Sequence, residues 1–206
     1  MLLQRACVVT AAVLVASNVS ALAGVTAIPE FTGNLSEGFE NVAPPGGQPT
    51  PLTVLNGVAT MDDQLAHFNV IAFSWQGPSG SFGPYNGNLF EGSVAGSTLI
   101  TFTTPMSQFG GFFNTTGMVP NGQAILRDAG GNIIDTVPMS ITPVEWNWQG
   151  WSSTTPFTSI ELISASSPGI GIQADDLQVT FAPEPASIGL LGLSALALAR
   201  RARRSK

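Results

Sequence analysis

The sequence is almost without cysteine, and this absence limits both how the chain can be stabilised and what it can catalyse. The only cysteine, Cys7, lies in an N-terminal segment that we expect to be removed. A mature chain without thiols forms no disulfide, no thiolate metal site and no cysteine nucleophile. An exported domain of this kind depends on its hydrophobic core, and a bound metal ion is the remaining candidate for added stability.

Positive charge is equally scarce in the body of the chain, residues 24–182. Of the seven Lys and Arg, five lie in the last seven residues and one is Arg5, which leaves only Arg127 in the body. Twelve of the thirteen Asp and Glu lie there, so the body has a formal charge of about −11, whereas the whole chain has −6. Nucleic-acid binding needs Lys and Arg against phosphates and is therefore disfavoured. Divalent cations are the natural counter-ions.

Residue patterns typical of catalysis are also missing. His67 is the only histidine, and in its apolar stretch a satisfied or surface histidine is several times commoner than a general base. The sequence has no nucleophile elbow, no H-E-x-x-H motif, no P-loop and no dinucleotide fingerprint. We therefore predict no catalytic residue. One alternative stays open, a hydrolase in which two carboxylates such as Glu145 and Glu161 flank a glycosidic bond.

The body also lacks any stretch with the 3.6-residue apolar period of an ordinary helix. Gly, Pro, Asn, Ser and Thr interrupt it roughly every ten residues, and the segments between them alternate apolar and polar side chains. Residues 128–132 are typical of a hairpin loop. The pattern predicts an all-β fold, a two-sheet antiparallel sandwich of the jelly-roll type. The predicted strands are 52–59, 68–75, 98–103, 109–115, 146–151, 157–164 and 177–181, and in the last of these Leu177, Val179 and Phe181 share the buried face.

The C-terminal end has a three-part order. Pro183, Glu184 and Pro185 come first, and the prolines prevent a helix from running back through them. Residues 186–199 form an uncharged, mostly apolar run, which is followed by Arg200, Arg201, Arg203, Arg204 and Lys206. As a helix this run spans roughly 21 Å, less than the ~30 Å hydrocarbon core, so snorkelling arginines or local thinning must close the gap. We expect a transmembrane helix in the inner membrane, with the basic end cytoplasmic.

This order resembles the PEP-CTERM sorting signal of Gram-negative and related bacteria, over residues 183–206. The resemblance implies that the tail holds a precursor in the inner membrane. It also implies that an exosortase-type enzyme processes the precursor near Pro183-Glu184-Pro185 during export to the cell surface or extracellular matrix. An ordinary tail anchor is the alternative, but a plain anchor has no need of Pro-Glu-Pro and favours a longer span.

The N-terminal segment predicts a signal peptide over residues 1–23. Arg5 supplies the positive region, an apolar stretch follows, and Ala21 and Ala23 form an A-x-A site for signal peptidase. The chain therefore divides into a signal peptide (1–23), a β-sandwich ectodomain (24–182) and the sorting signal (183–206).

Short motifs across the body, among them Phe39-Glu40, residues 109–114 and residues 173–179, resemble the β-sandwich ectodomains often found ahead of PEP-CTERM tails. These are similar in layout to jelly-roll carbohydrate-binding modules. The resemblance implies one structural calcium ion, held by Glu40 with Asp175 or Asp176. The alternative is that Asp175 and Asp176 are a solvated strand start. Asp62-Asp63 is a weaker candidate, and we expect it in a loop facing water.

Four aromatic residues are candidate ligand contacts: Trp146, Trp148, Trp151 and Tyr85. Flat rings can stack on the C–H faces of sugars, and residues two apart in a strand share a face. Tryptophans beside an apolar strand are more often core residues.

The leading hypothesis is thus a non-enzymatic, exported protein of the cell surface or extracellular matrix. A calcium-dependent carbohydrate-binding module that contacts an extracellular polysaccharide is the main alternative.

Overall fold

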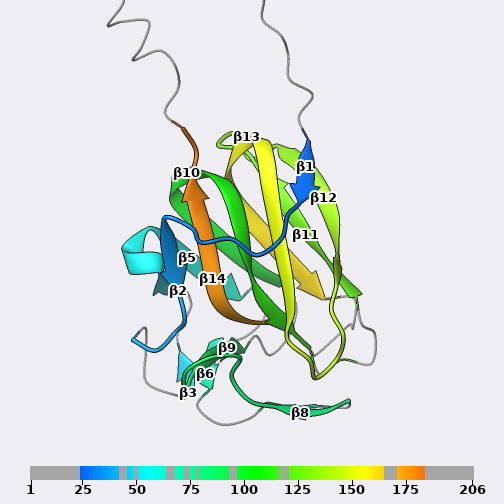
Figure 1. Cartoon of the computed structure of the whole chain (residues 1–206). Helices are drawn as coiled ribbons and strands as arrows, with labels where there is room; N and C mark the ends of the chain where they lie inside the picture. The colour runs from blue at the N-terminus through cyan, green and yellow to red at the C-terminus, as the bar shows by residue number, and fades with distance from the viewer. Residues whose placement is uncertain are drawn as a thin grey trace, which may run out of the picture.

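The computed structural model describes residues 24–41, 46–48, 51–63, 68–71, 75–77, 79–92, 97–115, 117, 121–164 and 171–183 (Figure 1). The predicted signal peptide, His67 and the tail from Glu184 onwards lie outside these residues. Within the described ranges the secondary structure is β-strand apart from one 3-10 turn, η1 (Leu55–Gly57). No helix in these ranges is long and apolar enough to span a bilayer. The prediction of an all-β fold is confirmed.

The strands form one large sheet and one small hairpin. The large sheet runs in the order β12 (Ile133–Ser140), β11 (Asn121–Arg127), β13 (Asn147–Ser164), β10 (Ser97–Asn114), β14 (Gln173–Phe181), β9 (Phe90–Gly92), β6 (Phe68–Ile71) and β3 (Gly46–Gln48). Four further strands join it: β1 (Val25–Ala27) on β13, β2 (Leu35–Glu37) on β14, β5 (Ala59–Asp63) on β10, and β4 (Leu52–Val54) on β5. The hairpin pairs β7 (Trp75–Gly77) with β8 (Gly80–Phe82). These pairings are all antiparallel.

Two long strands, β10 and β13, belong to both layers of the sandwich. Residues 98–102 of β10 pair with β5, whereas the part from Met106 onwards pairs with β14. β13 changes partners in the same way, from β1 around Ser152 to β11 from Ser159 onwards. The register between β10 and β13 shifts on both sides of Met106, and such irregularities bend a strand. The continuous sheet thereby curves over on itself (Figure 1).

Aromatic rings fill the space between the two layers. Phe102, in the first half of β10, lies 6.2 Å from Phe109 in the second half, measured between ring centroids. Phe109 also stacks parallel to Trp151 on β13 at 6.2 Å, and Phe157 lies 5.9 Å from Phe102. None of these four side chains is more than 4% exposed. They form the centre of the hydrophobic core.

Five of the seven predicted strands were correct in type but too short. Segment 68–75 contains β6 and the first residue of β7, and residues 72–74 lie outside the described residues. Segments 98–103 and 109–115 are parts of β10, and 146–151 and 157–164 are parts of β13. Pro105 in β10 and Pro156 in β13 lie at the bends, and the sequence indicates that a strand ends at each of them. The pairing of β10 with β13 nevertheless continues on both sides of these prolines. Segment 52–59 is instead divided by η1, because Leu55 and Asn56 adopt positive φ. The hairpin at 128–132 and the buried face of β14 are confirmed.

The segment between β1 and β2 crosses the outer face of the sheet formed by β13, β10 and β14 (Figure 1). At one end the Ile28 N–H donates to the Gly150 carbonyl at 2.8 Å. At the other end the Asn34 N–H donates to the Val179 carbonyl at 2.7 Å. The indole N–H of Trp148 donates to the Ile28 carbonyl at 3.1 Å. Both ends of this segment are therefore fixed to the sheet.

The first prediction concerns the core. Phe109→Ala removes a ring that contacts Phe102, Phe113 and Trp151, so we expect the free energy of unfolding to fall by about 3 to 5 kcal/mol. Ile133→Ala is the matched control, because Ile133 is 55% exposed and its truncation costs little. Urea unfolding of residues 24–182 measures both. Equal losses in the two variants would contradict this description of the core.

Candidate functional site

The carboxylates predicted to share a site lie around one loop, residues 83–89, which we call the platform loop. Asp175 and Asp176 stand near the start of β14, and Glu40 stands in the turn after β2. The platform loop lies between these two positions in space and bonds to both. Glu40 and Asp175 therefore bind different parts of the same loop.

A β-bulge directs Asp175 to this loop. Gly110 of β10 pairs with Gln178, but Phe112 pairs with Asp175, so β14 contains one extra residue between the two pairs. Asp176, within that interval, has φ 46°, the left-handed region that bulges use. Without the extra residue Asp175 would share the core face with Leu177. The bulge turns Asp175 to the outer face instead, beneath the platform loop.

Asp175 is fully buried and accepts three backbone hydrogen bonds. Its Oδ2 accepts from the N–H groups of Tyr85 at 2.9 Å and Asn86 at 3.3 Å, and its Oδ1 accepts from the Asp176 N–H at 2.8 Å. Burial raises the pKa of Asp175 to about 7, although the three N–H donors act in the opposite direction. The carboxyl group is therefore poised to change charge near neutral pH.

Glu40 holds the other end of the platform loop. Its Oε1 accepts from the N–H groups of Asn88 at 2.6 Å and Leu89 at 2.8 Å, and these two donors lower the pKa of Glu40. Gly87 has φ 63°, and a side chain there would collide with the Glu40 carboxylate. Asn86 adds a side-chain bond to Asp176 Oδ2 at 3.2 Å. The loop is thus fastened by carboxylates near both of its ends.

This arrangement differs from an oxygen cage for calcium. Calcium takes oxygen ligands, whereas the platform loop turns N–H donors towards Glu40 and Asp175. The described residues contain no group of three or more His, Cys, Asp or Glu that could hold a metal ion. As placed here, the three carboxylates do not fit one ion. The calcium site stays a prediction.

Of the four candidate aromatics, Tyr85 is the exposed one. The residue is 45% exposed, and its ring stacks on Phe112 with centroids 3.6 Å apart and planes 15° apart. Burial, followed by the charges of Glu30, Asp176 and Asp175, raises the pKa of Tyr85, so the hydroxyl keeps its proton. The platform loop therefore presents an aromatic face with carboxylates at its margin.

The three tryptophans are placed differently from one another. Trp151 is a core residue, 2% exposed, so it offers no face to a ligand. Trp146 precedes β13, is half-buried, and its indole N–H donates to the Gly83 carbonyl at 2.9 Å. Trp148 is half-buried and lies edge-on to Phe31, with centroids 5.7 Å apart. Trp146 and Trp148 mainly support the platform loop and the segment between β1 and β2.

The carboxylate pair considered for a hydrolase is not assembled. Glu145 lies just before β13, whereas Glu161 lies near its far end, opposite Leu99. Glu161 forms an ion pair with Arg127, with an N–O distance of 3.5 Å. Asp62-Asp63, expected in a loop, is the end of β5, because this segment pairs with Thr98 and Leu99 of β10.

Sequence reasoning missed Glu37, on β2. Its Oε1 accepts from the Phe39 N–H at 2.9 Å and its Oε2 from the Leu55 N–H at 2.8 Å. Both donors have positive φ, 60° for Phe39 and 54° for Leu55, which is costly for bulky side chains. The only feature of the sequence that points to Glu37 is its position three residues before Glu40. Nothing in the sequence pattern predicts that Glu37 accepts hydrogen bonds from Phe39 and Leu55.

Comparison with known proteins identifies the tail. Residues 182–204 match the PEP-CTERM protein-sorting motif, which confirms the predicted sorting signal. Such a motif implies an exported, membrane-anchored precursor that an exosortase processes. Of the matched residues, the structure describes Ala182 and Pro183.

For the body, no curated protein matches the chain. Solved structures with a similar fold include a DUF4465 family protein from Bacteroides caccae, with 8% identity and a TM-score of 0.42, covering 82% of this chain and 97% of that one. A family 6 carbohydrate-binding module from Clostridium cellulolyticum, in complex with xylose, has 13% identity and a TM-score of 0.32, covering 52% and 84%. A family 29 carbohydrate-binding module has 10% identity and a TM-score of 0.35, covering 58% and 100%. At these identities and TM-scores, the ligands and binding sites of the matched proteins cannot be assigned to this chain.

The second prediction concerns pH. In the unfolded chain Asp175 has an ordinary pKa near 3.8, whereas in the folded state it is about 7, so the folded state binds more protons between these values. The free energy of unfolding therefore falls as pH rises from about 4 to 7, by at most roughly 4 kcal/mol. Asp175→Asn removes this contribution, so wild type should lose stability relative to the variant across that window. Urea unfolding of residues 24–182 at several pH values measures the difference.

Asp128→Asn is the control variant, because the pKa of Asp128 is shifted in the opposite direction from that of Asp175. Hydrogen bonds from Asn132 lower the pKa of Asp128, so its stabilising contribution is present above the ordinary pKa and is lost as pH falls below it. If the difference in free energy of unfolding between wild type and Asp175→Asn does not vary between pH 4 and 7, burial does not raise the pKa of Asp175.

The third prediction tests calcium. A site formed in the folded state stabilises by about 2.7 kcal/mol at a hundredfold excess of ion over Kd, which is roughly 5 to 10 °C in Tm. Residues 24–182 are melted in calcium chloride and in sodium chloride at matched ionic strength. The same comparison is made on Asp175→Asn plus Asp176→Asn. A calcium increment lost in the double variant establishes the site, and equal melting in both salts rejects it.

Proposed function

We propose that the chain is a non-enzymatic protein of the cell surface or extracellular matrix, whose β-sandwich is presented by its PEP-CTERM tail. The observation that carries this proposal is the position of the motif. β14 ends at Phe181 and the motif starts at residue 182, so the tail leaves directly from the last strand. The Ala182 N–H donates to the Pro105 carbonyl at 2.9 Å, which fixes the exit point to β10.

The platform loop lies at the opposite end of β14 from this exit. Asp175 lies six positions before Phe181, about 20 Å along an extended strand. In Figure 1 the arrow of β14 points towards the tail, while β8 and β9 lie at the other end of the molecule. With the tail in the membrane, the platform loop faces away from it. The engagement of Glu40 and Asp175 by backbone N–H groups, and the separation of Glu145 from Glu161, support a non-enzymatic role.

The fourth prediction tests sorting. Replacing Pro183, Glu184 and Pro185 by alanines leaves the apolar run 186–199 unchanged, so membrane insertion should persist while release to the surface fails. Fractionation of cells expressing the full chain measures both. The control replaces Pro143, in the turn before β13, by alanine and should be released as wild type. Normal surface delivery of the triple variant would leave a plain anchor as the better explanation.

A second candidate function, carbohydrate binding, is favoured by Tyr85. An exposed aromatic ring beside hydrogen-bonding carboxylate and amide groups is a typical sugar-contacting combination. Phe112 beneath the ring and Asp175 beneath the backbone hold Tyr85 in place without a ligand.

The fifth prediction tests this candidate. Tyr85→Ala removes the stacking face, so retention of the full chain on an extracellular polysaccharide column should fall by about tenfold or more. Ile133→Ala removes the other large exposed apolar side chain of the described residues and should change nothing. Unchanged retention of Tyr85→Ala would exclude Tyr85 as the binding surface.

A further inference from the structure

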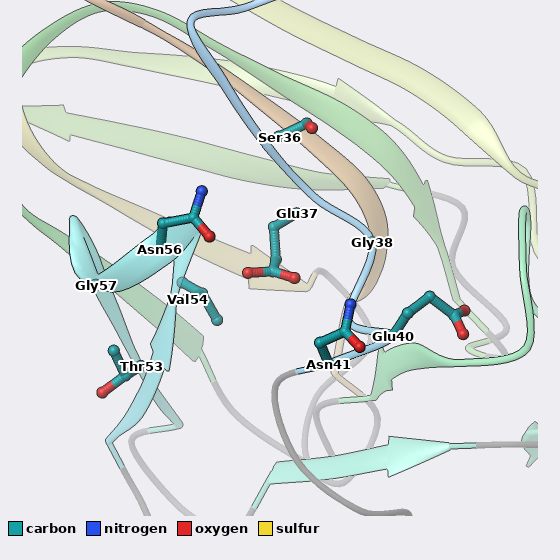
Figure 2. Close-up of a pocket in the computed structure, with 9 residues that line it drawn as sticks. All are labelled: Ser36, Glu37, Gly38, Glu40, Asn41, Thr53, Val54, Asn56 and Gly57. Atoms are coloured by element: carbon teal, nitrogen blue, oxygen red, sulfur yellow. The ribbon is translucent and has the colours of Figure 1, made fainter.

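A second concave site lies next to the platform loop, beside Glu37. A pocket of about 450 Å³ opens between β2, the turn after it, and the β4–η1 segment (Figure 2). Its polar side chains are those of Ser36, Glu37, Glu40, Asn41, Thr53 and Asn56. This volume lies within the range of about 300 to 1,000 Å³ that small-molecule sites occupy.

The pocket is held open by the protein itself. Glu37 bonds to the N–H of Phe39 on one wall and to the N–H of Leu55 on the other. The side chains of Phe39 and Leu55 are both 0% exposed and packed in the core, while their backbones adopt positive φ. One carboxylate therefore joins the two walls, and core packing keeps them from moving together. Little ordering is needed when a ligand enters, which favours binding.

The polar groups that line the pocket determine which kind of ligand fits it. Ser36, Asn41, Thr53 and Asn56 are exposed to solvent, and within the described part of the chain their side chains make no hydrogen bond to the protein, so a ligand would replace water at them. Hydroxyls and amides both donate and accept, so a fitting ligand must do the same. An ammonium group only donates, so it could bond to the carboxylates of Glu37 and Glu40 but not to the amide N–H groups of Asn41 and Asn56. An anion would meet two carboxylates and no cation. Hydroxyl groups of an uncharged ligand satisfy all of these requirements.

We propose that this pocket binds a segment of a neutral saccharide and is a second subsite, next to the Tyr85 surface. Glu40 connects the two, because it lines the pocket and also holds the platform loop at Asn88 and Leu89. The proposal rests on the carbohydrate-binding function given above and extends it. Asn41 and Asn56 bind the saccharide hydroxyls, and Glu37 is a positioning residue.

The experiment uses the full chain, purified in a detergent without a sugar headgroup. Soluble neutral oligosaccharides of glucan, mannan, xylan and galactan type are the probes, and an oligogalacturonate is the anionic arm. Asn41→Ala plus Asn56→Ala removes two sets of hydrogen bonds, so we expect affinity to fall by about tenfold. Asn121→Ala plus Thr136→Ala, exposed positions on the β11–β12 edge, is the control and should leave affinity unchanged. Calorimetry at about 0.5 M salt removes non-specific charge effects.

The variants separate this proposal from the function on which it rests. Loss of binding in both Tyr85→Ala and the asparagine double variant supports two subsites. Loss in Tyr85→Ala alone keeps carbohydrate binding and overturns the pocket, whereas loss in the double variant alone assigns binding to the pocket. Binding of the oligogalacturonate as tightly as the neutral probes overturns the proposed selectivity. No binding of any neutral probe by wild type overturns both.

Discussion

Hydrogen bonds from backbone N–H groups to carboxylates hold together the end of the sandwich that faces away from the tail. The body has twelve acidic side chains and one cation, Arg127, which is paired with Glu161. Ion pairs therefore cannot neutralise the acids at this end. Glu37, Glu40 and Asp175 instead accept from seven N–H groups, and each of them joins segments distant in the sequence. Hydrogen bonds to ionised carboxylates are stronger than bonds to neutral acceptors, and they keep loops in place where strands end. Burial raises the pKa of Asp175 to about 7, so Asp175 is a fully charged acceptor only above that pH.

The same constraint explains why strain gathers here. Five non-glycine residues of the described chain have positive φ, and Phe39, Leu55 and Asp176 are bonded to, or adjacent to, one of these carboxylates. Each such backbone costs of the order of 1 to 3 kcal/mol. The cost is tolerated because the positive φ directs an N–H group or a side chain into a hydrogen bond that holds the loops in place. The two surfaces that we propose to bind saccharide, Tyr85 and the pocket beside Glu37, both lie next to this arrangement.

Local pattern predicted the strands well, and tertiary effects account for what it missed. Alternation in residues 177–181 correctly assigned the buried face of β14, because each strand there has one buried side. It could not predict that β10 continues past Pro105, since pairing with β13 and β14 overrides the local signal. Nothing in the sequence predicts the β-bulge at Asp176, with its left-handed backbone. This bulge nevertheless determines to which face of β14 the Asp175 side chain points. The sorting tail was predictable because its three parts act through composition and order rather than through packing.

We infer that Glu40 and Asp175 fasten the platform loop independently of any ion. Amide hydrogen exchange of the full chain in a calcium chelator tests it most directly. We expect protected amides at Tyr85, Asn88 and Leu89 in the wild type. We also expect loss of protection at Asn88 and Leu89 in Glu40→Ala, and at Tyr85 in Asp175→Ala. Exchange of all three wild-type amides at the rate of an open loop, with protection restored by calcium, would contradict it.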